Sequence, residues 1–202
     1  RELSSQHVGL VGMGAIGQET ARMLGVFGCR ISYYDAYRPS VERERELNVS
    51  YLKLEELLQD CDVISLHVPV LPSTINMIGS QELALMKRTA LLVNTSRGEV
   101  VDQKALAEAL ERGTIYGAAI DTLSPEPPPR SHPLLTLSQE AAARLLLTPH
   151  IAGTTDEAFT RMLKWAVANM QLVVDGKPPN NVVNGVKGAS YPGEVMGKDI
   201  SL

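Results

Sequence analysis

The stretch Val8-Gly9-Leu10-Val11-Gly12-Met13-Gly14-Ala15-Ile16-Gly17 lies near the start of this chain of 202 residues. Its apolar first half predicts a strand, its second half has the pattern G-x-G-x-x-G, and a helical pattern follows at once. A second apolar run then ends at Asp35. This order of strand, glycine turn, helix, strand and acid is typical of proteins that bind a dinucleotide.

Each glycine of the turn has a physical role in that interpretation. Gly12 allows the tight turn, Gly14 lets a pyrophosphate approach the backbone, and Gly17 lets the helix pack closely on the sheet. The helix N-terminus favours the phosphate charge. Asp35 is expected to accept hydrogen bonds from a ribose 2′-hydroxyl and to repel a 2′-phosphate, which favours NAD over NADP, although the nearby Arg38 counters part of this preference.

Composition argues against several classes of protein. A net charge of -4 argues against a general nucleic-acid binder, and no apolar run is long enough to span a bilayer. The polar opening Arg1–Gln6 lacks the apolar segment of a signal peptide. Cys29 and Cys61 are expected to be buried free thiols of a reduced, cytoplasmic compartment, and with four scattered histidines no metal site is expected.

Strand and helix patterns alternate along the chain, which predicts an α/β fold with a doubly wound parallel sheet of the Rossmann type. The expected strands are His7–Val11, Arg30–Tyr34, Val63–His67, Ala90–Asn94, Ile115–Ile120 and Leu145–Leu147. The expected helices are Ile16–Leu24, Val41–Leu47, Leu54–Gln59, Gln81–Met86, Gln103–Glu111 and Asp156–Asp175. The all-apolar strand Ala90–Asn94 is expected to be buried on both faces. Residues 1–184 are expected to form one domain, and 185–202 an irregular tail.

The carboxyl ends of parallel strands meet at one rim of such a sheet, and ligands bind there. Arg97 follows one of these strands, and its planar fork can hold a carboxylate through two parallel hydrogen bonds. Glu126 and His150 also follow strands, and a carboxylate beside an imidazole stabilises the protonated ring and fixes its tautomer for acid–base chemistry. The alternatives are a surface ion pair for Arg97, a solvated Glu126, and a His150 that caps a helix.

The chain resembles the D-isomer-specific 2-hydroxyacid dehydrogenase family, NAD-binding domain. The matching blocks are Gly12 to Gly17, Asp35, Asp62 to Pro69 with Thr74, Asn94 to Gly98, Asp121 to Pro127 and Thr148 to Gly153. The resemblance implies reversible hydride transfer between a nicotinamide and C2 of a small 2-hydroxy or 2-oxo acid. It implies that Arg97 binds the carboxylate and carbonyl of the substrate, that His150 exchanges the proton and that Glu126 supports His150.

The same resemblance implies the cofactor site, with NAD as the cofactor. The expected residues are Gly12, Gly14, Ala15, Ile16, Gly17, Asp35, His67, Val68, Pro69, Thr74, Thr95, Ser96, Arg97, Asp121, His150 and Gly153. His67 is expected to pack near the adenine side, and Asp121 to be a polar group near the nicotinamide. Members of this family tend to dimerise through the cofactor domain, so the resemblance also implies a possible homodimer. Glyoxylate, hydroxypyruvate, phosphoglycerate and lactate-type acids all remain open as substrates.

The sequence departs from the family in two places. Family members carry a substrate domain before the glycine turn, whereas here the turn comes almost at once, so the chain is expected to be the cofactor domain of a longer enzyme. The segment Pro127–Ala143 is longer than the usual connection and is expected to form a surface excursion. His7 and His132 are expected to lie on the surface.

Three other functions remain open at this point. One is an NAD(H)-sensing binding protein without turnover, like the transcriptional corepressors that share this fold. Another is a formate dehydrogenase, which is less favoured because those relatives place Gln where Glu126 stands. A phosphite-oxidising enzyme could use the same three residues.

Overall fold

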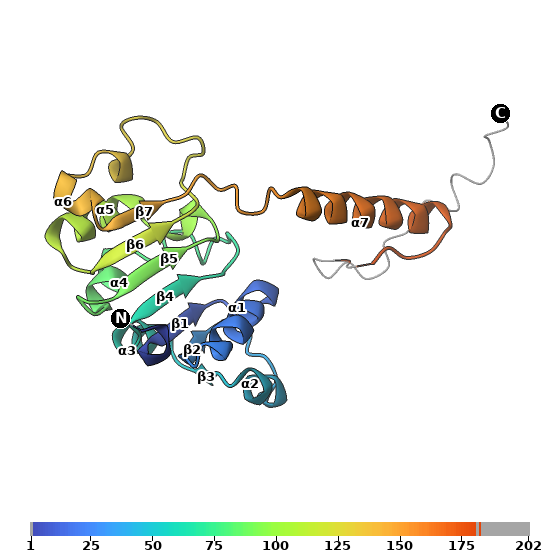
Figure 1. Cartoon of the computed structure of the whole chain (residues 1–202), viewed down its shortest axis with the longest axis horizontal. Helices are drawn as coiled ribbons and strands as arrows, with labels where there is room; N and C mark the ends of the chain where they lie inside the picture. Colours follow the sequence, from blue (N-terminus) through green and yellow to red (C-terminus); the bar gives the residue numbers. More distant parts are fainter. Residues whose placement is uncertain (1, 181, 183–202) are drawn as a thin grey trace. The chain divides into compact units, whose positions relative to one another are not determined.

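The computed structural model describes residues 2–180 and 182, and it divides the chain into a first unit, residues 1–150, and a second unit, residues 151–202. The first unit is built on a parallel sheet whose seven strands lie in the order β3-β2-β1-β4-β5-β6-β7 (Figure 1). The strands are β1 (His7–Val11), β2 (Arg30–Tyr34), β3 (Ser50–Tyr51), β4 (Val63–Leu66), β5 (Leu91–Asn94), β6 (Gly117–Ile120) and β7 (Leu145–Leu147). The predicted doubly wound parallel sheet is confirmed, and only the two-residue β3 was missing from the prediction.

Helices pack on both faces of this sheet. The helices are α1 (Ala15–Val26), α2 (Val41–Leu47), α3 (Leu54–Asp60), α4 (Ser80–Leu85), α5 (Gln103–Arg112) and α6 (Gln139–Ala142), with short 3-10 turns η1 (Leu3–Ser5), η2 (Gly98–Val100) and η3 (Pro133–Leu135). α1 contacts α2 beside β2, whereas α3, α4, α5 and α6 contact one another in sequence. Asp102 caps α5 through the backbone N–H groups of Lys104 and Ala105, and Gly113 ends it at φ +62°.

The core divides into two layers because successive side chains of a strand point to opposite faces. Val8 and Leu10 of β1 pack with Ile31 and Tyr33 of β2 in one layer. On the other face, a Cβ at Gly9 would lie 2.6 Å from Leu57 Cδ2, so the absence of a side chain lets α3 approach the sheet. Both cysteines are free and buried, as expected.

Strand β5 differs from its prediction. Leu92 and Asn94 are buried against the helices that follow, but Leu91 is 38% exposed and Val93 is only partly buried. The same face continues onto β7, where Leu146 is 62% exposed. An apolar strand therefore need not be covered on both faces, and the expectation of two-sided burial for Ala90–Asn94 was wrong for the part of the chain described.

His7 is buried, contrary to the surface position expected for it. Its ring Nδ1 lies 3.2 Å from the carbonyl oxygen of Asp60, which can only accept, so Nδ1 carries the proton. Nε2 then accepts the hydroxyl proton of Ser32 at 2.8 Å. Burial, and next the charge of Arg30, lower the pKa of His7, so the ring stays neutral in the folded chain.

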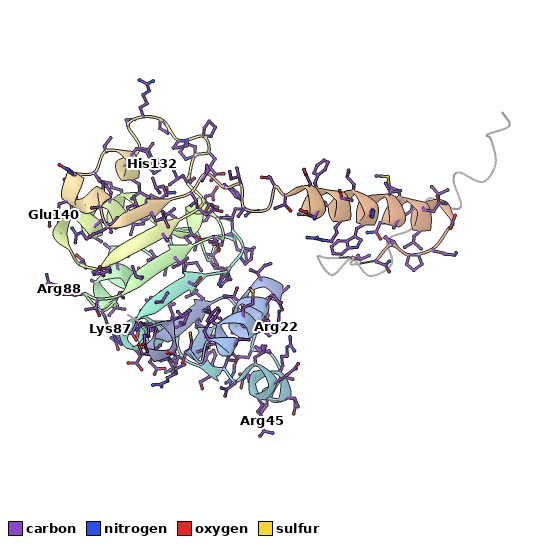
Figure 2. All side chains as sticks on the ribbon, viewed as in Figure 1. Arg22, Arg45, Lys87, Arg88, His132 and Glu140 are labelled. Atoms are coloured by element: carbon purple, nitrogen blue, oxygen red, sulfur yellow. The ribbon has the colours of Figure 1, made fainter. Side chains whose placement is uncertain are left out.

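The segment Pro127–Ala143 contains more structure than a loop. His132 was expected on the surface but is buried, and its Nδ1 accepts the backbone N–H of Leu134 at the start of η3 (Figure 2). The backbone N–H and hydroxyl of Ser138 both donate to Glu111 at 2.7 Å, which fastens the start of α6 to α5. The excursion is therefore a docked part of the first unit.

The second unit contains α7 (Asp156–Val174), which matches the predicted helix Asp156–Asp175 to within one residue. Its side chains are not buried in the described residues. The first unit ends at His150, and the expectation of one domain over residues 1–184 stays a prediction. The predicted tail 185–202 lies outside the described residues. Among the helices described, none is both long and apolar enough to cross a membrane.

The neutral state of His7 predicts a pH dependence of stability. A histidine whose pKa is lowered by folding binds fewer protons in the folded state, so the free energy of unfolding decreases as the pH falls below about 6.5. We expect the thermal midpoint to decrease between pH 7 and pH 5, and His7→Gln to reduce that slope. Differential scanning fluorimetry across this range measures both. An equal slope in the variant would contradict the assignment.

Candidate functional site

The glycine turn joins β1 to both of its neighbours. The backbone N–H of Gly12 donates to the carbonyl of Tyr34 at 2.8 Å, and the N–H of His67 donates to Val11 at 2.7 Å. Gly12 has φ +103°, and a Cβ there would lie 2.7 Å from the carbonyl carbon of His67. A Cβ at Gly17 would lie 2.1 Å from the carbonyl oxygen of Gly12. Both positions therefore require glycine, for backbone shape and for close approach.

Gly14 is different because it faces open space. A Cβ at this position would meet no atom within 4 Å, and its φ of -71° suits any residue. It is the N-cap of α1, and no side chain caps that helix. The first N–H groups of α1 therefore point at an open region where the helix dipole favours an anion. This geometry fits the pyrophosphate of a dinucleotide.

Asp35 is held at the end of β2 by two backbone groups. Its Oδ2 accepts the N–H of Met13 in the glycine turn at 2.6 Å, and its Oδ1 accepts the N–H of Tyr37 at 2.8 Å. Each carboxylate oxygen keeps a second lone pair for another donor. Asp35, the residue predicted to bind the ribose, is therefore held in a fixed position beside the glycine turn.

A cleft of about 350 Å³ lies at the rim between α1 and the ends of β4 and β5. Its lining brings together seven of the predicted cofactor residues with Val70: Ile16, His67, Val68, Pro69, Thr95, Ser96 and Arg97. The His67 ring bonds the Ser65 hydroxyl at 3.0 Å, and burial lowers its pKa. Thr74 is buried, and its hydroxyl instead closes the loop after β4 by bonding Pro69 and Leu71.

The loop that carries Arg97 is organised by Asn94, which the sequence reasoning did not single out. Asn94 is buried, its Nδ2 donates to the carbonyl of Arg97 at 2.8 Å, and its Oδ1 accepts the N–H of Ser96 at 3.0 Å. Arg97 itself is exposed, and its Nη1 donates to the Ser96 carbonyl. A polar side chain at the end of an apolar strand was the available signal.

The next loop packs directly against this one. A Cβ at Gly98 would lie 2.4 Å from the carbonyl carbon of Leu123, so glycine allows the loops after β5 and β6 to touch. The N–H of Leu123 in turn donates to Glu126 Oε1 at 2.9 Å. The two loops that carry Arg97 and Glu126 are thereby held side by side.

Glu126 and His150 form the predicted pair. His150 Nδ1 lies 2.9 Å from Glu126 Oε2, so the ring donates to the carboxylate and leaves Nε2 available for proton exchange. This bond, and next the N–H of Leu123, lower the pKa of Glu126. The carboxylate is therefore ionised at neutral pH, and the alternatives of a solvated glutamate and a helix-capping histidine do not describe this site.

Asp121 holds the backbone of His150. Its Oδ1 accepts the N–H of His150 at 3.2 Å and the hydroxyl proton of Thr148. His150 has φ +54°, a left-handed conformation that is uncommon for residues other than glycine. Asp121 therefore has a positioning role that the sequence reasoning did not foresee, in addition to its expected place near the nicotinamide.

An apolar hollow of about 510 Å³ lies on the outer side of this pair. Leu123, Leu147 and Pro149 of the rim and Pro127, Pro128 and Leu135 of the excursion line it, together with Asp121, Glu126 and Thr148. The long excursion thus builds a wall next to the carboxylate.

Residues 1–152 match the model of the D-isomer specific 2-hydroxyacid dehydrogenase family, NAD binding domain. The chain belongs to this family. The resemblance seen in the sequence is confirmed.

Relatives of known function support the same family. The chain is 47% identical to a glyoxylate reductase of Korarchaeum cryptofilum over 88% of this chain and 52% of the relative, and 42% identical to one of Aeropyrum pernix over 91% and 53%. An NAD-complexed D-isomer specific 2-hydroxyacid dehydrogenase from Lactobacillus delbrueckii ssp. bulgaricus matches with a TM-score of 0.79 at 33% identity, over 91% of this chain and 57% of that one. The chain spans about half the length of the curated relatives it matches.

The family assignment makes NAD the cofactor of this domain, and the open N-terminus of α1 together with the fixed Asp35 fits it. The individual contacts to NAD stay predictions. Gly153 belongs to the second unit and is not placed relative to the cleft.

The glycine turn gives a prediction that separates folding from binding. Gly14→Ala adds a methyl group in open space, so we expect an unchanged thermal midpoint but a Kd for NADH at least about tenfold weaker, because the methyl group blocks the pyrophosphate. Gly12→Ala should instead destabilise the fold by about 1–3 kcal/mol. Fluorescence titration and thermal unfolding measure the two effects.

Gly25→Ala is the matched control, because a Cβ there also meets no atom within 4 Å but lies at the far end of α1. It should leave NADH binding unchanged. Equal affinity in Gly14→Ala and Gly25→Ala would show that the cofactor does not approach this turn.

Proposed function

We propose that this chain is the cofactor-binding part of an NAD-dependent oxidoreductase that interconverts a D-2-hydroxy acid and its 2-oxo acid. The observation that carries the proposal is the 2.9 Å bond between His150 and Glu126, at the same rim as the glycine turn. A neutral or protonated ring with its tautomer fixed suits the proton exchange that this reaction needs.

Each residue has a distinct part in that proposal. When bound, NAD(H) supplies or accepts the hydride at C2. His150 Nε2 gives a proton to the carbonyl oxygen during reduction and takes the hydroxyl proton during oxidation. Arg97 binds the substrate carboxylate and polarises the carbonyl. Its side chain is exposed, and its Nη1 donates to the backbone carbonyl of Ser96. Glu126 balances the charge of the protonated ring.

Glyoxylate is the first substrate to test, because glyoxylate reductases are among the relatives. Hydroxypyruvate, phosphoglycerate and lactate-type acids belong to the same chemical class and share the carboxylate and carbonyl that Arg97 would hold. The comparisons give no support to a corepressor. A formate dehydrogenase stays less favoured because Glu126 occupies the position of its Gln, and a phosphite-oxidising enzyme remains compatible with the same three residues.

The decisive experiment is turnover of the full-length natural protein with NADH and each 2-oxo acid. We expect His150→Gln to lower kcat by about 10²–10⁴ while NADH still binds, because the proton donor is lost. Arg97→Lys should raise KM, because Lys has no planar fork. The control Arg88→Lys changes an arginine shortly before β5, at the amino ends of the strands and thus away from the rim (Figure 2), and should leave both constants unchanged. Saturable NADH binding without turnover of any 2-oxo acid would favour the binding-protein alternative.

Glu126→Gln tests the charge of the pair. The lowered pKa of Glu126 keeps it ionised from pH 5 to 8, and its loss removes the stabilisation of the protonated ring. We expect kcat for 2-oxo acid reduction to fall about tenfold or more, while the Kd for NADH stays unchanged. Glu140→Gln on the surface of α6 is the control (Figure 2). A kcat equal to that of the wild-type protein would rule out support of His150 by Glu126.

We also propose a cytoplasmic homodimer. The buried free thiols Cys29 and Cys61 are compatible with a reduced compartment, and family habit supports the dimer. Light scattering coupled to gel filtration should give twice the mass of the full-length chain, and a monomer mass at micromolar concentration would refute the dimer.

A further inference from the structure

Arg38 follows Asp35 closely, in the region where this fold can use an arginine to accommodate the 2′-phosphate of NADP. Its presence beside an acid that favours NAD therefore needs an explanation. The inference below rests on the proposed use of Asp35 as the ribose acceptor.

The guanidinium of Arg38 already has two kinds of partner: its N–H groups form hydrogen bonds, and its flat face contacts an aromatic ring. Its Nε and Nη2 donate to Glu44 Oε1 at 3.2 and 2.8 Å. Its central carbon lies 4.4 Å from the ring centre of Tyr51, a cation–π contact. Arginine binds phosphate best through the same donors, so these contacts compete with a 2′-phosphate.

Glu44 is itself firmly placed. Its side chain is only 13% exposed, and it accepts the hydroxyl proton of Tyr33, a buried residue of β2. Burial, and next the bond to Glu44, raise the pKa of Tyr33 to about 12, so this donor keeps its proton. Tyr33 also packs edge-on against Tyr51 at 5.6 Å between ring centres. Residues from β2, β3 and α2 thus hold Arg38 together.

The other cations of α2 do not replace Arg38. Arg43 bonds Gln18 at 2.8 Å and Glu46 at 2.7 Å, and Arg45 projects away from the sheet (Figure 2). The charges of Arg38 and Glu44 cancel, and the carboxylate of Asp35 then dominates the subsite. The 2′-phosphate of NADP would be repelled by this carboxylate.

We propose that Glu44 is a positioning residue for cofactor choice: it holds Arg38 away from the adenine ribose and thereby makes the domain favour NAD over NADP. Asp35 accepts hydrogen bonds from the ribose hydroxyl. Glu44 keeps Arg38 bound to itself, so that Arg38 is not available to bind the 2′-phosphate of NADP. Such discrimination combines a favourable contact to NAD with the removal of a favourable contact to NADP.

The test is fluorescence titration of the full chain with NADH and NADPH. Glu44→Gln keeps the size of the side chain but removes its charge, which weakens its hold on the donors of Arg38. We expect NADPH affinity to increase roughly five- to tenfold and NADH affinity to stay within about twofold. Glu44→Asp retains the charge and should keep the wild-type ratio of the two Kd values. An unchanged ratio in Glu44→Gln would overturn the proposal.

Glu44→Gln could improve NADPH binding in two ways, by releasing Arg38 or by removing the repulsion between Glu44 and the 2′-phosphate. Variants of Arg38 distinguish them. Arg38→Ala alone should leave NADPH binding unchanged, and in combination with Glu44→Gln it should abolish the gain. A gain that survives in the double variant, or weaker NADPH binding in Arg38→Ala, would overturn the proposal. Glu46→Gln is the control for charge, since Glu46 lies on the same helix and pairs with Arg43.

The result also separates this inference from the proposed function. Failure of the wild-type chain to bind NADH would overturn both of them. NADH binding that persists together with an unaltered cofactor ratio in Glu44→Gln would overturn this inference alone.

Discussion

The contact between Gly12 and the backbone of His67 is the constraint on which the rim of this molecule depends. β1 lies between β2 and β4, and at its end the chain must pass within van der Waals distance of the β4 loop. Only a residue without Cβ at φ +103° meets both requirements. The start of α1 then packs through Gly17 against the carbonyl oxygen of Gly12 itself. The position of the helix dipole, and with it the phosphate site, follows from that one approach.

The other half of the rim is held by polar side chains that bond the backbone of a neighbouring loop. Asn94 shapes the Arg97 loop, Glu126 accepts from Leu123, and Asp121 accepts from His150. The left-handed conformation of His150 costs about 1–2 kcal/mol. Asp121 offsets part of this cost by accepting the backbone N–H of His150, and Glu126 orients the ring.

The sequence predicted the elements that have a local cause and missed those that depend on distant partners. β1, β2 and β7 have the predicted bounds because apolar pattern and turn residues specify them. β3 has two residues and exists through its pairing with β2, which no local pattern reveals. The burial of His7 likewise depends on Ser32 and Asp60, and the pairing of Glu126 with His150 spans 24 residues, so the family resemblance rather than spacing identified it.

Because the Glu126–His150 pair is partly exposed, its geometry can be formed while the interaction between the two charges is still weak. Its side chains are 40% and 42% exposed, and ion pairs in that position contribute little to stability because water screens them. The same charges interact more strongly when water is excluded, since the effective dielectric constant falls. Geometry is therefore set by the loops of this chain, whereas the strength of the pair depends on what covers the rim. A ligand that closes over His150 would gain that strength at the moment the proton has to move.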